Sequence, residues 1–147
     1  MEKTKLGISV GLFAAIIYFI GATNNILIVA IMAGYILICE SDEWLKKMSI
    51  KALILTVFFA VFVILINYLT SFLSAFGGTI NNIAGYGVMF NIINFLFYTL
   101  PSLIRTIISV IQIILFIMFG FKAYKKQDIK IKIIDDMLDK NFNDKQE

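Results

Sequence analysis

The stretch Ser41–Thr70, SDEWLKKMSIKALILTVFFAVFVILINYLT, organises the rest of the chain. It begins with charged residues and continues, without a glycine or proline, into a long apolar run. Ser41 is a candidate N-cap, and the two acids after it would lie in the first helical turn, where the helix dipole favours negative charge. The pattern predicts an interfacial helix that continues directly into a long transmembrane helix.

The charged part of this stretch has the composition of a segment that lies at a membrane surface. Trp44 would sit at the level of the lipid headgroups. Lys46, Lys47 and Lys51 could extend from the same helix to water and phosphates. We therefore interpret these four residues as an interfacial anchor.

The composition of the whole chain points to the bilayer. Hydrophobic residues make up 60% and charged residues 16% of the sequence, against roughly 45–50% and about 25% in soluble domains. There are no charges in the 34 residues between Lys5 and Glu40, or in the 53 residues between Lys51 and Arg105. The sequence predicts an all-α integral protein of the cell membrane, with a membrane domain over residues 1–121 and a charged cytoplasmic tail over 122–147.

The membrane domain divides into four apolar segments, at about residues 6–21, 26–39, 52–74 and 88–121. The first two are separated by Ala22–Asn25. Each would span only roughly 21–24 Å as a helix, which is short for a hydrocarbon core of about 30 Å. We expect a short helical hairpin that either crosses the bilayer or re-enters on the same side.

Small residues recur at helical spacing in both arms of this hairpin. Gly7 and Gly11 would share one face of the first arm, and Ala30 and Gly34 one face of the second. Such faces allow close helix contact. We expect them to pack the two arms together, with a seam between two copies of the chain as the alternative.

The second half of the chain is predicted to leave the membrane once before it returns. Ala75–Gly87 is rich in glycine and asparagine and is typical of a loop. Val88–Leu100 would form an outer amphipathic helix, and Pro101 would bend the chain into a final transmembrane helix that ends near Phe121. Within the tail, Ile129–Ile133 alternates like a short strand.

The distribution of lysines predicts an orientation. Lysines gather in Met1–Lys5, in Lys46–Lys51 and in the tail, whereas Ala75–Gly87 has none. The positive-inside rule places both termini and the Lys46–Lys51 segment in the cytoplasm, and the glycine-rich loop outside.

Five polar residues interrupt the apolar segments of the second half and could line a polar groove. They are Asn67, Asn91, Asn94, Arg105 and Gln112. A charge within a membrane is costly and often functional, but a position near a helix end would let Arg105 extend to the headgroups instead. The amides could equally form hydrogen bonds between helices, each worth about 1 kcal/mol.

The sequence argues against catalytic chemistry. It has no histidine, which is the commonest general base and metal ligand, and a single cysteine, Cys39. It contains no phosphate-binding loop, nucleophile elbow or nucleic-acid motif. The adjacent acids Asp42 and Glu43 suit capping and surface pairing better than acid–base catalysis. We expect no enzyme activity, no cofactor, no metal site and no nucleic-acid partner.

Two parts of the chain resemble a known family. Ile38–Leu53, ICESDEWLKKMSIKAL, and the closing Phe121–Ile134 region are similar to small, mostly uncharacterised bacterial membrane proteins related to the chloroplast inner-envelope import channel subunit (Tic-type). The chain lacks the proline after the acidic turn, the histidine before the long helix and the tail proline of the commoner family pattern. The resemblance implies a four-segment helical membrane fold and, for the plant members, polypeptide translocation.

These observations lead to a functional hypothesis. We expect a non-enzymatic subunit or scaffold of a membrane complex, with the lipid bilayer and either a membrane-protein partner or a second copy of the chain as its contacts. The alternatives are a holin-like pore formed by several copies and an immunity protein against a membrane-active peptide.

Overall fold

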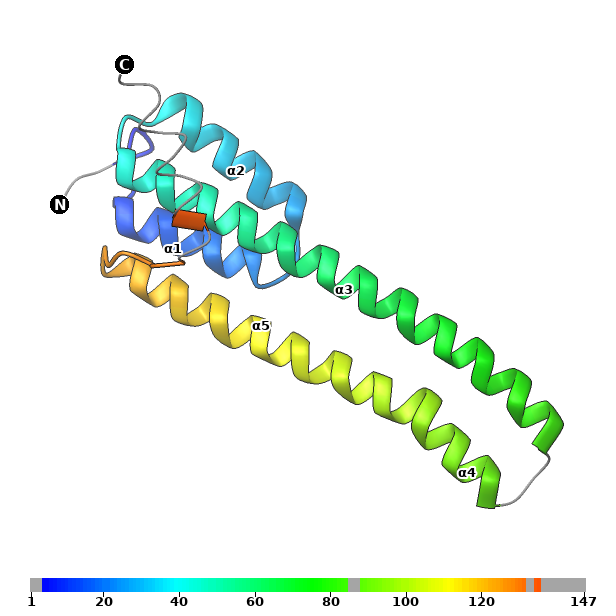
Figure 1. The fold of residues 1–147 in the computed structure, drawn as a ribbon. Coiled ribbons are helices and arrows are strands. Elements are labelled where there is room, and N and C mark those ends of the chain that lie inside the picture. The colour runs from blue at the N-terminus through cyan, green and yellow to red at the C-terminus, as the bar shows by residue number, and fades with distance from the viewer. Residues whose placement is uncertain (1–3, 85–87, 132–133, 136–147) are drawn as a thin grey trace. The chain divides into compact units, whose positions relative to one another are not determined.

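The computed structural model describes residues 4–84, 88–131 and 134–135. The fold is all-helical, with four helical segments in these residues (Figure 1). They are α1 (Val10–Gly21), α2 (Ile26–Cys39), α3 (Glu43–Ala84) and a composite segment of α4 (Val88–Asn94), the π-helical turn η1 (Phe95–Thr99) and α5 (Leu100–Tyr124).

The chain divides into two compact units. The bundle unit comprises Met1–Phe58 and Ile113–Glu147, and so contains α1, α2, the start of α3 and the end of α5. The hairpin unit comprises Phe59–Gln112 and contains the rest of α3 and α5 together with α4 and η1.

The short N-terminal hairpin was predicted correctly, and each of its helices is capped by a side chain. Ser9 Oγ accepts a hydrogen bond from the Leu12 amide (3.3 Å), and Asn25 Oδ1 accepts one from the Ile28 amide (3.4 Å). The first helix begins later than the apolar pattern suggests, because Gly7 lies in a turn at φ 77°. At 12 and 14 residues, α1 and α2 are about 18 and 21 Å long.

The predicted continuity of the central stretch is confirmed, because α3 is one helix of 42 residues. Its N-cap is Asp42 rather than Ser41. Asp42 Oδ1 accepts a hydrogen bond from the Leu45 amide (2.8 Å) and satisfies one of the amides that lack an intrahelical partner.

The loop predicted for Ala75–Gly87 is wrong over residues 75–84, which continue α3; residues 85–87 lie outside the described part. Gly77 serves close packing rather than a turn, since a Cβ there would lie 2.8 Å from Phe97 Cβ. Tertiary contact thus overrides the local preference of glycine.

Pro101 does not interrupt the helix where a bend was predicted, since helical residues run without a gap from Val88 to Tyr124. Proline lacks the amide that would bond the carbonyl of the preceding turn. That preceding turn is the π-helical η1, where the helical hydrogen bonds are rearranged. The Thr99 and Ser102 hydroxyls donate to carbonyls within this region.

Helix α1 is the core of the bundle unit, with eight of its twelve residues buried, against three of fourteen in α2. The Tyr18 ring lies 6.3 Å from that of Phe116 and 6.1 Å from that of Phe119. A Cβ at Gly21 would collide with the Phe116 ring and lie 2.7 Å from Thr56 Oγ1. The turn after α1 therefore lies at the level of Thr56.

The two arms of the hairpin unit are antiparallel. Tyr98 Oη donates a hydrogen bond to the Ser74 carbonyl (2.9 Å), and Gly77 packs against Phe97. This register places Arg105 opposite residues 67–69. Two helical stretches of the chain, Glu43–Ile80 and Asn91–Tyr124, are long and apolar enough to cross a membrane.

Candidate functional site

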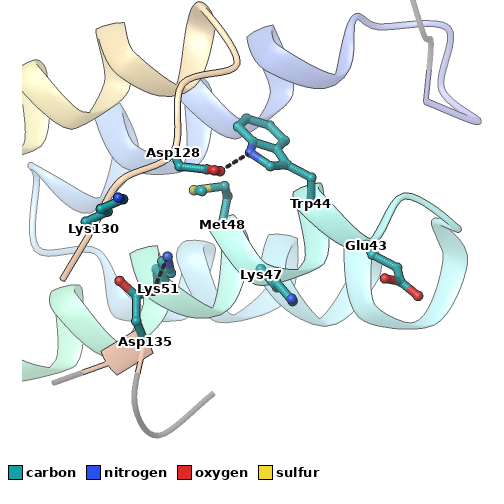
Figure 2. Close-up of a pocket in the computed structure, with 8 residues that line it drawn as sticks. All are labelled: Glu43, Trp44, Lys47, Met48, Lys51, Asp128, Lys130 and Asp135. Carbon is teal, nitrogen blue, oxygen red and sulfur yellow. Dashed lines mark hydrogen bonds and ion pairs between the residues drawn. The ribbon is translucent and has the colours of Figure 1, made fainter. Parts of the chain in front are cut away.

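The most polar cavity among those described is a cleft in the bundle unit. It lies between the first turns of α3 and the segment that follows α5 (Figure 2). Its volume is about 520 Å³. The residues that line this α3–tail cleft are Glu43, Trp44, Lys47, Met48, Lys51, Asp128, Lys130 and Asp135.

Lys51 holds the tail to α3 at the inner wall of the cleft. Its Nζ forms an ion pair with Asp135 and donates a hydrogen bond to the Ile129 carbonyl (2.8 Å). The Lys51 side chain is only 8% exposed and that of Asp135 27%. The expectation that Lys51 extends to water is therefore wrong, because a carboxylate and a carbonyl from the tail replace its hydration.

Trp44 makes a second link to the tail. Its Nε1 donates a hydrogen bond to Asp128 Oδ1 (2.9 Å), and its ring is half-buried. Lys46 and Lys47 are half-buried as well. Their role as an interfacial anchor stays a prediction.

The start of the tail belongs to the bundle unit. Ile129 is buried, and the described residues 129–131 form no strand, contrary to the predicted one; residues 132–133 lie outside the described part. A turn closes the segment, because the Asp135 amide donates to the Ile131 carbonyl (2.8 Å) and Asp135 Oδ2 accepts from the Ile131 amide (2.8 Å). The only sequence signal for this arrangement was the alternation of isoleucine and lysine in Ile129–Ile133.

The N-terminal residues lie close to the same region. The Lys5 amide donates to both carboxylate oxygens of Glu40 (3.0 and 3.2 Å), two residues before the cap of α3. Glu40 is buried. In the described residues, the start of the chain, the acidic turn and the tail up to Asp135 thus meet at one end of the bundle unit.

The small residues predicted to join α1 and α2 do other things. Gly7 lies outside the helices, Ala30 is exposed, and a Cβ at Gly34 would meet nothing within 4 Å. Gly11 packs against the end of α5, where its Cβ would lie 2.5 Å from the Tyr124 carbonyl oxygen. The prediction that these residues pack the two arms together is therefore wrong, and the alternative of a seam between two copies of the chain stays a prediction.

Two glycines that sequence reasoning passed over make the close contacts of the bundle unit. Gly21 faces Phe116, and a Cβ at Gly120 would lie 2.5 Å from the Phe19 ring. Each glycine thus admits an aromatic ring from another helix. Neither belongs to a small-residue repeat, so no local signal marked them.

The five polar residues of the predicted groove do not form one site. Asn91 and Gln112 are 21 positions apart, which is roughly 30 Å along a helix. Gln112 is buried, whereas Asn91 and Arg105 are exposed and Asn67 and Asn94 are half-buried. Only Asn67 and Arg105 share a level in the register of the hairpin unit.

A second cavity, missed by the sequence because it lies where a loop was predicted, is an apolar groove along α3 in the hairpin unit. It has a volume of about 580 Å³. The rings of Phe72 and Phe76 lie 4.8 Å apart within it. The residues that line this hairpin groove are Phe72, Ala75, Phe76, Thr79 and Ile80.

Within the described part of the chain, no three His, Cys, Asp or Glu side chains come together as they would around a metal ion. Comparisons with protein-family models, with curated proteins and with solved structures found no match to this chain. The resemblance to Tic-type proteins stays a prediction.

Proposed function

We propose that the protein is a non-enzymatic, membrane-spanning subunit or scaffold whose hairpin groove binds a helix of a partner protein. The observation that carries the proposal is the groove itself, an apolar stripe on an exposed helix. It runs through Phe72, Phe76 and Ile80, which follow one another at four-residue spacing on one helical face.

Three charges on the two long helices, together with Asn67 at the level of Arg105, define the part that crosses the bilayer in this proposal. From Lys51 to Asn67 there are 16 residues along α3, or about 24 Å. From Arg105 to Lys122 there are 17 residues along α5, or about 26 Å. Both lengths approach a hydrocarbon core of about 30 Å. On α5 the exposed Arg105 and Lys122 side chains can extend further, to the headgroups.

The N-terminal hairpin re-enters on this view rather than crosses. The turn after α1 lies at the level of Thr56, only five residues beyond Lys51. That corresponds to about 8 Å of helix. The proposal keeps both termini with the Lys46–Lys51 segment in the cytoplasm, as the positive-inside rule predicts.

The hairpin groove then lies beyond the level of Arg105, outside the hydrocarbon core. Phe72 and Phe76 are 60% and 52% exposed. A continuous apolar surface of this kind marks an interaction site in a protein that is not surrounded there by lipid. A groove lined at i, i+4 and i+8 suits an amphipathic partner helix. The Tic-type resemblance extends the proposal to a complex that translocates polypeptides.

The test is co-purification from native membranes after gentle detergent extraction. Ala75→Trp fills the hairpin groove, whereas Leu65→Trp adds the same side chain at an exposed position of α3 outside it. We expect the wild type and Leu65→Trp to retain a stoichiometric partner and Ala75→Trp to lose it. An unpartnered wild-type monomer, or equal retention by both variants, would contradict the proposal.

A further inference from the structure

We propose that the α3–tail cleft binds the headgroup of a zwitterionic, amine-bearing phospholipid such as phosphatidylethanolamine. The inference rests on the membrane placement proposed above, but not on a partner at the hairpin groove. It is carried by the position of the cleft, by the balance of charge around it and by the polar groups that remain open to a ligand.

The cleft lies where the chain passes from charged to uncharged sequence. Lys51, at its inner wall, is the last charge before 53 uncharged residues. This is the level at which headgroups meet the hydrocarbon core. Trp44 and Met48 add apolar surface to the lining. The volume of about 520 Å³ lies within the usual range of ligand pockets, about 300–1,000 Å³.

The charges that line the cleft are balanced. Three are positive and three negative, so a ligand without net charge meets no net repulsion. Lys51 and Asp135 pair with each other and form the wall. Lys130 is exposed on the lining, and Asp128 accepts from Trp44 with one oxygen, so the cleft offers an ammonium and a carboxylate oxygen to groups of opposite sign on a ligand.

This arrangement fits both ends of a phosphoethanolamine group. The ammonium of Lys130 suits the phosphate. The second oxygen of Asp128, whose first oxygen accepts from Trp44, suits the primary amine, which donates hydrogen bonds. Glu43 points away from these two residues (Figure 2). An anionic headgroup would bring negative charge to the carboxylates, and a choline headgroup has no N–H to donate.

The chain contains its own probe, because Trp44 is its only tryptophan and lines the cleft. The full-length protein in detergent is titrated with dihexanoyl phosphatidylethanolamine while its tryptophan fluorescence is recorded. The phosphatidylcholine and phosphatidylglycerol analogues and inorganic phosphate form the other arms. We expect a saturable change with phosphatidylethanolamine that is at least tenfold weaker with the other three.

Two lysines of the tail region provide a matched pair of variants. Lys130→Ala removes the phosphate ligand and should weaken binding about tenfold, the factor that loss of one hydrogen bond to a charged group gives. Lys125→Ala removes an exposed lysine that does not line the cleft, and should bind as the wild type does.

The other outcomes overturn the proposal. An equal response to inorganic phosphate would make the cleft a general anion site, and an equal response to phosphatidylglycerol would remove the role of the carboxylates. A non-saturable response, or equal binding by Lys130→Ala and the wild type, would show that the lipid does not occupy the cleft. If no partner protein binds the hairpin groove, the results expected in these lipid titrations stay the same, so the two proposals can fail separately.

Discussion

The bundle unit and the hairpin unit are built from the same two long helices but satisfy their side chains in different ways. In the bundle unit, α1 is largely buried, and Lys51 pairs with Asp135 across 84 residues of sequence. In the hairpin unit, Phe72 and Phe76 pack on each other and remain more than half exposed. The bundle unit thus encloses a core of its own, whereas the hairpin groove presents its apolar surface to its surroundings.

This difference between the two units indicates that one governs the stability of the protein and the other its association with partners. Contacts that close the bundle unit should govern unfolding, because they are buried and specific. The surface of the hairpin unit should govern association, because its burial requires lipid or another protein. Substitutions in the two units should therefore affect different measurements.

The largest effect is expected when Lys51 is replaced by methionine. The variant leaves the Asp135 carboxylate and the Ile129 carbonyl without their partner, and we expect a loss of about 3 kcal/mol in the free energy of unfolding. Denaturation in mixed micelles measures it. Lys130→Met, at an exposed lysine of the same cleft, is the control and should change stability by less than about 0.5 kcal/mol. Similar losses in both variants would mean that the buried pair has no special weight.

Smaller effects on the free energy of unfolding are expected at two helical glycines of the bundle unit, and the two effects should have opposite signs. Gly21→Ala places a methyl group against the Phe116 ring and should cost about 2 kcal/mol through overpacking. Gly34→Ala meets nothing within 4 Å and should stabilise α2 by about 0.5 kcal/mol through helix propensity. The same micelle denaturation decides the signs. Stabilisation by Gly21→Ala would contradict the close packing of α1.

Adjacent glycines in the hairpin unit should also differ. Gly77→Ala forces its methyl group toward Phe97 and should cost about 1 kcal/mol after its gain in helix propensity. A Cβ at Gly78 would lie 3.4 Å from Tyr98 Oη, so Gly78→Ala should be neutral or slightly stabilising. Hydrogen exchange of residues 70–80 should accelerate in Gly77→Ala only. If both variants exchange alike, the arms do not pack in this register.

The smallest effect concerns the hydrogen bond between the hairpin arms. Tyr98→Phe removes the bond to the Ser74 carbonyl and should cost about 0.5 kcal/mol, because the site is partly exposed. Tyr68→Phe is the control at a more exposed tyrosine. Hydrogen exchange at the amides near Ser74 measures the local opening of the helices. Equal exchange in the two variants would mean that the Tyr98–Ser74 hydrogen bond does not stabilise the hairpin unit.

Hydropathy and local signals predicted the helical segments but few of their contacts. Ile26–Cys39 was placed correctly because Asn25 and the following apolar residues act locally. The helix over residues 75–84 was missed because the preference of Gly77 is overridden by a contact with Phe97, which lies 20 residues away. No local pattern can report such a contact.

The candidate site shows the same limit. The sequence identified Trp44, Lys47 and Lys51 as a group, since they share a short charged segment. It did not find that the tail returns to them through Asp128 and Asp135, because charge pairing over about 84 residues depends on the folded bundle.

The central claim, that the two units differ in what covers them, is tested most directly by photo-cross-linking in living cells. A benzophenone amino acid is placed at Phe76 in the hairpin groove or at Phe121 on α5 in the bundle unit, two aromatic side chains that are 52% and 59% exposed. We expect one heteromeric protein adduct of defined mass from Phe76 that Ala75→Trp abolishes, and lipid adducts alone from Phe121. Lipid adducts alone from Phe76 would contradict the claim.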